Sequence, residues 1–238
     1  MALTLYFHPF SSYCQKAVIA LYENDTPFTP RHINLSDEAE AAELRSLWPM
    51  RKFPVLQDDA RNQTVAESSI IIEYLAQHYP GKSKLIPSDP DHAREVRFKD
   101  RFFDLHIMDH ASKAVVDHFR PAGKNDRFGV EASLATVRTA YDVLENDIAG
   151  KTWATGDTFT MADVAAFPAL FYADLIVPLA DKHKKAAAYL DRLLKRPSVA
   201  RALKEGAATL MEGFPFHAQY RSRMARIGAE LHPSAPTG

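Results

Sequence analysis

The chain has 238 residues, enough for one large domain or two small ones with a substantial core. Its 29 basic and 30 acidic residues leave a net charge of -1, so bulk electrostatics give no reason to expect nucleic acid or an anionic membrane as a partner. The only cysteine, Cys14, excludes an intrachain disulfide and a cysteine-based zinc site, and it favours a reducing compartment.

The start of the chain predicts a location inside the cell. Residues 1–4 show no charged segment followed by an apolar one, which a secretory signal would have. No apolar run in the sequence approaches the roughly 20 residues that span a bilayer. We therefore expect a cytoplasmic protein that has no membrane partner.

The first predicted elements are a strand and a helix. Leu3, Leu5 and Phe7 alternate with more polar residues, which is typical of a strand with one buried face. Residues 14–22 then place apolar side chains at helical spacing, so a helix follows at once.

Ser11 and Ser12 lie at the junction between this strand and this helix. The first N–H groups of a helix have no partner inside the helix, and the helix dipole is positive at that end. The junction therefore favours binding of an anion. Simple capping of the helix by a serine hydroxyl is the alternative role for the pair.

Five further elements complete an α/β part of the chain. Pro30 interrupts a strand at 28–33 and removes a hydrogen-bond donor, so this strand should lie at a sheet edge. Ser36 is the predicted N-cap of an acidic helix that ends near Leu47. The other elements are strands at 53–57 and 64–66, a hairpin turn at 58–62, and a helix that opens at 67–69 and ends at Pro80.

The second part is predicted to be all helical. Three prolines between 80 and 90 indicate a linker, so we expect one domain at 1–80, a linker at 81–90, a helical domain at 91–213 and a loosely held tail at 214–238. Helical periodicity covers 91–119, 128–148, 161–175, 182–195 and 198–210. Thr160 and Asp163 have capping-box spacing at the start of the third of these helices.

Four motifs in these elements resemble those of the glutathione S-transferases in type, order and spacing. They are Ser11-Ser12-Tyr13-Cys14, Phe53-Pro54-Val55-Leu56, Glu67-Ser68-Ser69-Ile70-Ile71 and Thr160-Met161-Ala162-Asp163. The serine-first pattern looks most like the zeta, theta and delta branches. The resemblance implies an α/β thioredoxin-like N-terminal domain that binds glutathione, an all-α C-terminal domain that helps to form the second-substrate pocket, and usually a homodimer.

The resemblance also implies roles at the first motif. Ser11 matches the serine that contacts the glutathione sulfur, with Ser12 and then Cys14 as the alternatives. The hydroxyl would only donate a hydrogen bond to the thiolate, helped by the positive helix end. Glutathione would be a cosubstrate, and no metal is implied. Cys14 falls on the apolar helix face, which favours a core position over a mixed disulfide.

Two other motifs imply the rest of the glutathione site. Pro54 would be cis, so that the backbone of Phe53 pairs with the cysteinyl unit like an added strand; a trans-proline at a strand start is the alternative. Lys52 would meet the glycine carboxylate, or remain in solvent. Glu67 would take the γ-glutamyl ammonium and Ser68 the carboxylate, with ordinary helix capping as the alternative.

The sequence departs from the family pattern at residues 48–51. The segment Trp48-Pro49-Met50-Arg51 lacks an asparagine before the proline and has arginine where many relatives have glycine. This departure leaves the contact with the glycine end of the tripeptide open.

The helical part offers weaker candidates. In the family, the first helix of the second domain lines the second-substrate pocket, so Asp104 and Met108 are predicted there, with surface or core positions as alternatives. His106 and His110 have metal-ligand spacing. A third ligand is not evident, which favours a polar helix face or a pocket wall.

The predicted function is a glutathione transferase of the detoxification type, in which the Ser11-stabilised thiolate attacks an electrophilic, hydrophobic second substrate. Two alternatives stay open. One is a glutathione-dependent isomerase or dehalogenase of the zeta type, and the other is a noncatalytic glutathione-fold binding protein. The expected partners are glutathione, a small electrophile and a second copy of the chain, without nucleic acid.

Overall fold

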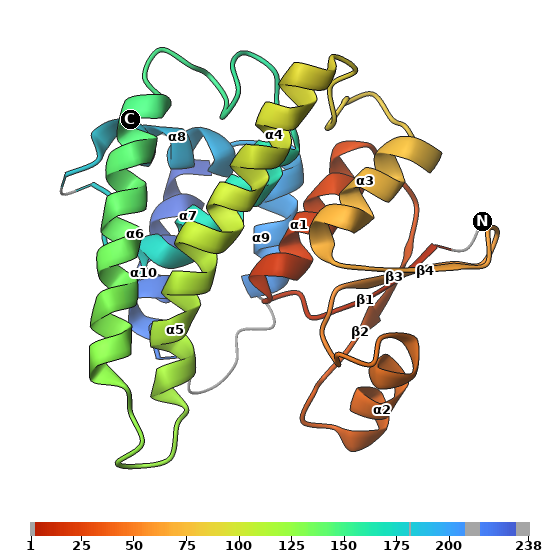
Figure 1. The fold of residues 1–238 in the computed structure, drawn as a ribbon, viewed down its shortest axis with the longest axis horizontal. Coiled ribbons are helices and arrows are strands. Elements are labelled where there is room, and N and C mark those ends of the chain that lie inside the picture. Colours follow the sequence, from red (N-terminus) through yellow and green to blue (C-terminus); the bar gives the residue numbers. More distant parts are fainter. Residues whose placement is uncertain (1–2, 181, 208–214, 232–238) are drawn as a thin grey trace, which may run out of the picture.

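A computed structural model describes residues 3–180, 182–207 and 215–231. The N-terminal part is a four-stranded sheet with helices on both faces, and the C-terminal part is a bundle of helices packed beside it (Figure 1). The predicted fold class, an α/β thioredoxin-like domain followed by an all-α domain, is confirmed.

The sheet is mixed, with strand order β2-β1-β3-β4. β1 pairs parallel with β2 and antiparallel with β3, which in turn pairs antiparallel with β4. The strands are β1 (Leu3–Phe7), β2 (Thr29–His32), β3 (Val55–Asp58) and β4 (Gln63–Ala66). Alternate residues of β1 are buried, and β2 lies at the edge, as the sequence predicted.

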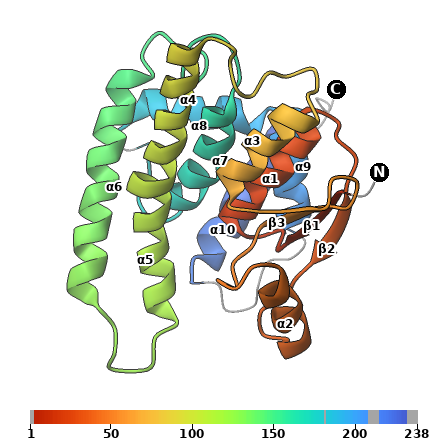
Figure 2. The ribbon, with the colours of Figure 1, turned by 45° about the vertical axis from the view of Figure 1, so that its right-hand side comes forward.

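Helices cover the two faces of the sheet unequally. α1 (Ser12–Glu23) and α3 (Ser68–His78) lie on one face, and α2 (Glu38–Leu47) lies on the other (Figure 2). The α1 face continues into the helical part, whereas α2 packs on a small separate cluster of Ile33, Leu44 and Val55. The start of α1 is therefore enclosed by both parts of the chain.

The predicted N-cap of α2 is wrong by one residue. Asp37 is the cap, because its carboxylate accepts hydrogen bonds from the N–H groups of Ala39 at 2.9 Å and Glu40 at 3.0 Å. Ser36 instead donates its N–H to the side chain of Asn34 at 3.0 Å. Both residues are favoured caps, and this local turn delays the helix start.

The helices of the second part largely follow the prediction. They are α4 (Pro90–Phe102), α5 (Asp109–His118), α6 (Arg127–Asp147), α7 (Met161–Asp174), α8 (Lys184–Leu194), α9 (Pro197–Ala207) and α10 (His217–Leu231). The single helix predicted at 91–119 contains a π-helical turn, η1 (Phe103–Met108), between α4 and α5. Such turns are rare and often lie at functional sites.

α10 corrects the prediction of a loosely held tail. This helix falls within residues 214–238, where no helix was predicted. Tyr220 is only 2% exposed, and its ring packs against Phe10 and Phe171, with centroid distances of 5.3 and 5.7 Å. α10 thereby supports the residue that precedes Ser11. Residues 208–210, the end of the helix predicted at 198–210, lie outside the described residues.

α7 is the central helix of the molecule. Its residues from Met161 to Ala173 are all buried, and it packs against α1, α4 and η1, so one continuous core joins the two parts. The predicted capping box at its start is confirmed, since the Asp163 carboxylate accepts the N–H of Thr160 at 2.8 Å. Among the described residues, no helix is both long and apolar enough to cross a membrane.

Candidate active site

The start of α1 is fixed from several sides. Ser11 is the N-cap, and its Oγ accepts a hydrogen bond from the N–H of Cys14 at 3.4 Å. The preceding loop is held by α7, because the Tyr172 hydroxyl donates to the carbonyl of Phe10 at 2.8 Å. A serine oxygen that accepts a hydrogen bond keeps its own O–H as a donor. Capping and donation to a bound anion are therefore compatible roles for Ser11.

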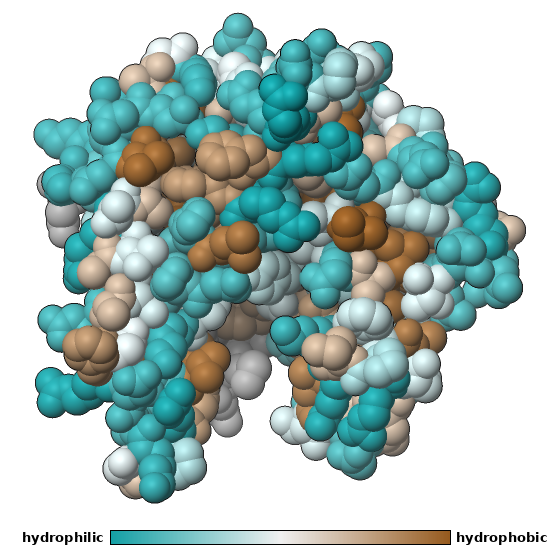
Figure 3. Space-filling view, in the orientation of Figure 1, coloured by the Kyte–Doolittle hydropathy of each residue, from teal (hydrophilic) through white to brown (hydrophobic). Residues whose placement is uncertain are grey.

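An apolar cavity of about 230 Å³ lies on one side of this helix start. Its lining residues are Phe10, Ser11, Ser12, Met108, Ala111, Ser112, Val115, Val116, Phe119, Tyr172 and Ile176. None of these described lining residues carries a charged side chain. The space-filling view shows the molecule hollowed between its two parts at this level, next to α5 (Figure 3). Met108 thus shares a cavity with Ser11 and Ser12.

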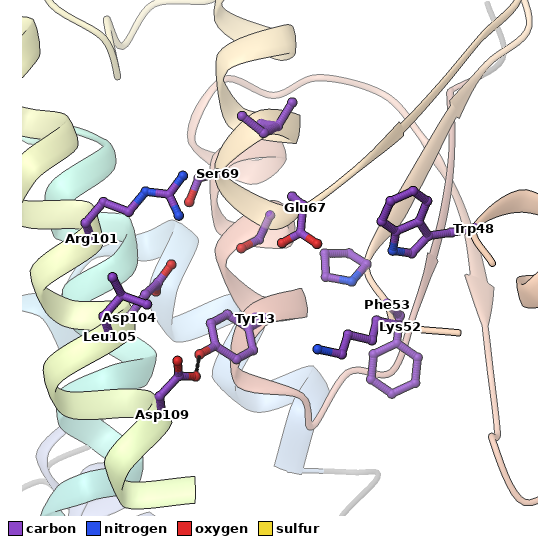
Figure 4. A pocket seen from close by; sticks show the side chains of 13 residues that line it. Tyr13, Trp48, Lys52, Phe53, Glu67, Ser69, Arg101, Asp104, Leu105 and Asp109 are labelled. Atoms are coloured by element: carbon purple, nitrogen blue, oxygen red, sulfur yellow. Dashed lines mark hydrogen bonds between the residues drawn. The ribbon is translucent and has the colours of Figure 1, made fainter. Parts of the chain in front are cut away.

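A polar cavity of about 360 Å³ lies on the other side. Its lining residues are Tyr13, Trp48, Lys52, Phe53, Pro54, Glu67, Ser68, Ser69, Ile70, Arg101, Asp104, Leu105 and Asp109. The structure brings together here all five residues predicted to bind glutathione, from the loop before β3 and the start of α3 (Figure 4).

Backbone geometry shapes the floor of the polar cavity. The Phe53–Pro54 peptide bond is cis, as predicted. Phe53 lies two residues before Val55, the first β3 residue that pairs with β1, so it stands just beyond the end of the ladder, and it lines the cavity. Glu67 is the N-cap of α3 with φ +70°, and its side chain makes no capping hydrogen bond. Its exposed carboxylate lines the cavity instead.

A buried cluster of charges lies beneath this cavity. The Lys16 ammonium contacts Asp100 at 2.8 Å, Asp104 at 2.5 Å and the hydroxyl of Ser69 at 2.9 Å. Ser69 in turn donates to Asp100 at 2.7 Å. Burial raises the pKa of Asp104 to about 6, although the nearby ammonium opposes this shift. The cluster joins α1, α3, α4 and η1 in one network.

Asp104 and Met108 were predicted in the same second-substrate pocket, and the structure separates them. Asp104 lines the polar cavity and Met108 the apolar one. They lie four positions apart in the π-helical turn η1, and the prediction that placed them together rested on the family resemblance alone.

Sequence reasoning assigned no site role to seven residues of the polar cavity, which are Tyr13, Trp48, Ser69, Ile70, Arg101, Leu105 and Asp109. The Tyr13 hydroxyl donates a hydrogen bond to the Asp109 carboxylate, which links α1 to α5 between the two cavities. Burial and this carboxylate raise the pKa of Tyr13 far above its usual value. Tyr13 belongs to the first motif, and Arg101 lies one helical turn before Asp104, so helical spacing was the available signal.

The structure places Cys14 in the core and His106 at the surface. Cys14 is fully buried, and burial raises the pKa of its thiol to about 12, which favours the core role. His106 is exposed and packs on Phe102, with a ring-centroid distance of 5.8 Å. Within the described part of the chain, no three His, Cys, Asp or Glu side chains gather in a way that could hold a metal ion.

Arg51, which stands where many relatives have glycine, adopts a backbone conformation that glycine favours. Arg51 has φ +53°, in the left-handed region that glycine adopts most easily. Its guanidinium donates to the carbonyl of Leu35 at 3.0 Å, which helps to hold this conformation. The loop therefore keeps a glycine-like shape with arginine in place, and it presents Lys52 to the cavity.

Two family models match the chain. Residues 5–83 match the model described as "Glutathione S-transferase, N-terminal domain", and residues 127–192 match "Glutathione S-transferase, C-terminal domain". A glutathione S-transferase-like protein, LUC7, from a Fusarium species is 29% identical over 60% of this chain, which spans 64% of that protein's length. Glutathione S-transferase F13 of Arabidopsis thaliana is 26% identical over 83% of this chain and 93% of its own length.

Solved structures of similar proteins have the same fold. A glutathione S-transferase from Methylobacterium radiotolerans, in complex with glutathione sulfonate, is 27% identical with a TM-score of 0.74, covering 85% of this chain and 94% of its own. A glutathione S-transferase from Methylobacillus flagellatus, with glutathione bound, is 24% identical with a TM-score of 0.77. The match covers 84% of this chain and 98% of that one.

Proposed function

Because the chain belongs to the glutathione S-transferase family, we propose that it joins the sulfur of glutathione to an electrophilic carbon of a small apolar compound. One observation carries this proposal: the start of α1 lies between a cavity lined by charged groups and an uncharged one. A charged tripeptide and an apolar electrophile would meet there, at the positive end of a helix.

The polar cavity would hold the tripeptide in an extended form. The backbone of Phe53 would pair with the cysteinyl unit like an added strand. Glu67 would take the γ-glutamyl ammonium, Ser68 at the start of α3 the adjacent carboxylate, and Lys52 the glycine carboxylate. The glutathione sulfonate complex of the Methylobacterium relative supports this use of the fold.

Ser11 would stabilise the thiolate. A free thiol has a pKa of about 8.5, and lowering it to about 6.5 requires about 2.7 kcal/mol of preferential stabilisation of the anion. A hydrogen bond to a charged group contributes about 1.5–3 kcal/mol, and a helix N-terminus adds about 0.3–1 kcal/mol. The Ser11 hydroxyl and α1 together are therefore sufficient, and no base or covalent serine intermediate is required.

In the reaction, the thiol proton leaves to solvent and the thiolate electron pair forms a carbon–sulfur bond. With a chlorinated nitroarene, the carbon–chlorine bond breaks and chloride leaves. Since the described lining of the second cavity has no charge, desolvation favours an uncharged electrophile over an ionised one.

The Ser11→Ala variant tests this assignment. We expect kcat/KM for a chlorinated nitroarene to fall about tenfold to a hundredfold, and the thiol pKa of bound glutathione to rise, because the charge-assisted hydrogen bond is lost. Ultraviolet absorbance of the thiolate measures that pKa. Ser12→Ala is the matched control and should change both values little. Equal losses in the two variants, or a thiol pKa in the wild-type complex no lower than that of free glutathione, contradict the assignment.

The same measurements separate the alternatives. An isomerase or dehalogenase would regenerate or consume glutathione without accumulating a conjugate, although Ser11→Ala would still reduce its rate. A noncatalytic binding protein would bind glutathione without turnover. A reductase centred on Cys14 would lose activity in Cys14→Ser and keep it in Ser11→Ala.

We also propose a homodimer, as the resemblance implied. Large apolar side chains are exposed on the face formed by α3, α4 and η1: Ile70 is 48% exposed, Phe98 61% and Leu105 47%. A second copy of the chain would cover them. Sedimentation of the wild type and of Phe98→Glu tests this, since a buried charge at the contact should produce monomers.

A further inference from the structure

Five charged side chains line the polar cavity, and two of them have partners among the residues that the structure describes. Asp104 pairs with Lys16, and Asp109 accepts the hydrogen bond of Tyr13. The side chains of Lys52, Glu67 and Arg101 make no hydrogen bond or ion pair with any residue that the structure describes.

These three unpaired charges come from separate elements. Lys52 belongs to the loop before β3, Glu67 caps α3, and Arg101 lies in the last turn of α4. Figure 4 shows Lys52 and Arg101 on opposite sides of Glu67, with the guanidinium of Arg101 on the same side of the cavity as Ser69. The cavity therefore presents a positive, a negative and a positive group in turn.

Glutathione carries the complementary set of charges. It has a carboxylate on glycine and, at the other end, an ammonium and a carboxylate on the same γ-glutamyl carbon. If Lys52 meets the glycine carboxylate and Glu67 the ammonium, the remaining carboxylate lies beside Glu67 on the side away from Lys52. Arg101 is the cation on that side.

We propose that Arg101 binds the α-carboxylate of the γ-glutamyl unit, together with Ser68 at the start of α3. This inference rests on the proposed function. A guanidinium is planar and can pair with a carboxylate through two parallel hydrogen bonds, which a lysine cannot do. The helical part would then select the tripeptide as well as the electrophile, and binding would depend on a free α-carboxylate.

The competing role for Arg101 is a contact between subunits. The residue is exposed and lies on α4 between Phe98 and Leu105, the apolar face proposed to meet a second copy. A subunit contact would affect every ligand alike, whereas a carboxylate receptor affects only ligands that have that carboxylate. Ligand chemistry therefore distinguishes the two roles.

Calorimetric binding to the full chain provides the test, with Arg101→Gln compared with Arg94→Gln. Arg94 is an exposed arginine of α4 outside the cavity, paired with Asp91 at 2.6 Å. Three ligands are used: glutathione, 4-aminobutyryl-cysteinylglycine, which lacks the α-carboxylate, and glutaryl-cysteinylglycine, which keeps that carboxylate and lacks the ammonium.

We expect Arg101→Gln to weaken binding of glutathione and of the glutaryl analogue about tenfold to a hundredfold, and to leave the aminobutyryl analogue unchanged. Arg94→Gln should bind all three ligands like the wild type. Equal weakening for all three, or none, overturns the role of Arg101. If the wild type itself binds no glutathione, the proposed function fails first, which is a separate result.

Discussion

The two cavities beside α1 differ in both chemistry and origin. The polar cavity gathers charged and hydroxyl groups from the sheet domain and from α4, η1 and α5, whereas the apolar cavity is lined mainly by η1, α5 and α7 and carries no charge among its described lining residues. The start of α1, η1 and α5 border both cavities, and Ser11 and Ser12 at the start of α1 line the apolar one while Tyr13 lines the polar one. This difference shows how one helix start can lie next to two unlike ligands, one charged and one apolar. Each ligand would lose its water in a cavity whose lining matches it, polar for the charged ligand and uncharged for the apolar one.

The polar side depends on a buried cation, and removing it should have the largest effect. In Lys16→Met, the carboxylates of Asp100 and Asp104 lose the ammonium that both contact while they stay buried. We expect the free energy of unfolding to fall by about 3–5 kcal/mol, the usual cost of leaving a buried charge unpaired. Urea denaturation measures it.

Lys82→Met is the matched control for this change. Lys82 pairs with Asp25 at 2.9 Å, but its side chain is 69% exposed, so solvent screens the pair and its removal should change the free energy of unfolding little. A similar small loss in Lys16→Met would mean that the cluster is held by packing rather than by charge.

Asp104 gives the polar side a pH dependence that the apolar side lacks. Burial raises its pKa to about 6, and a carboxyl whose pKa is raised on folding favours the folded state while protonated. Its contribution is therefore complete below about pH 4 and is lost as the pH rises through about 6. Over this range we expect the wild type to lose roughly 2–3 kcal/mol more unfolding free energy than Asp104→Asn.

Unfolding in urea at a series of pH values checks this difference. Asp59→Asn removes an exposed carboxylate in the turn after β3, so its profile should follow that of the wild type. Parallel profiles for Asp104→Asn and the wild type would show that the buried carboxyl titrates alike in the folded and unfolded chains.

The sequence predicted the polar cavity far better than the apolar one. Phe53, Pro54, Glu67 and Ser68 lie in motifs next to a strand or a helix start, and Lys52 comes directly before one of these motifs, where local patterns determine which way the backbone and side chains face. Val116, Phe119 and Ile176 come together at the apolar cavity from the ends of α5 and α7, which only the packing of the helices brings close, and any apolar residue could serve there.

Two differences from the expected arrangement have separate origins. Asp104 was expected with Met108, but Asp104 lines the polar cavity and Met108 the apolar one, and both lie in a π-helical turn that the sequence pattern did not indicate. α10 was expected as a tail, because the prolines near its ends indicate breaks, yet Tyr220 has an aromatic partner in Phe10 that no local pattern reveals. By contrast, the spacing of apolar residues along the chain was enough to predict the order of strands and helices.

The apolar side can be changed without disturbing the polar side, and Val116→Lys is the sharpest way to do so. Val116 lines the apolar cavity and is 60% exposed, so a lysine there should leave folding intact. We expect KM for an uncharged chloronitroarene to rise about tenfold, equivalent to about 1.4 kcal/mol, while the Kd for glutathione stays unchanged. A chloronitroarene that carries a carboxylate should become the better substrate, because the new cation attracts it.

Val143→Lys is the matched control, because Val143 is 49% exposed on α6 and lies outside the residues that line the cavity. It should leave both KM values and the Kd as they are. If Val116→Lys instead weakens glutathione binding as much as electrophile binding, the two cavities do not act separately. The two cavities would then form one shared site at the start of α1, and the charged and uncharged linings would not bind glutathione and the electrophile independently.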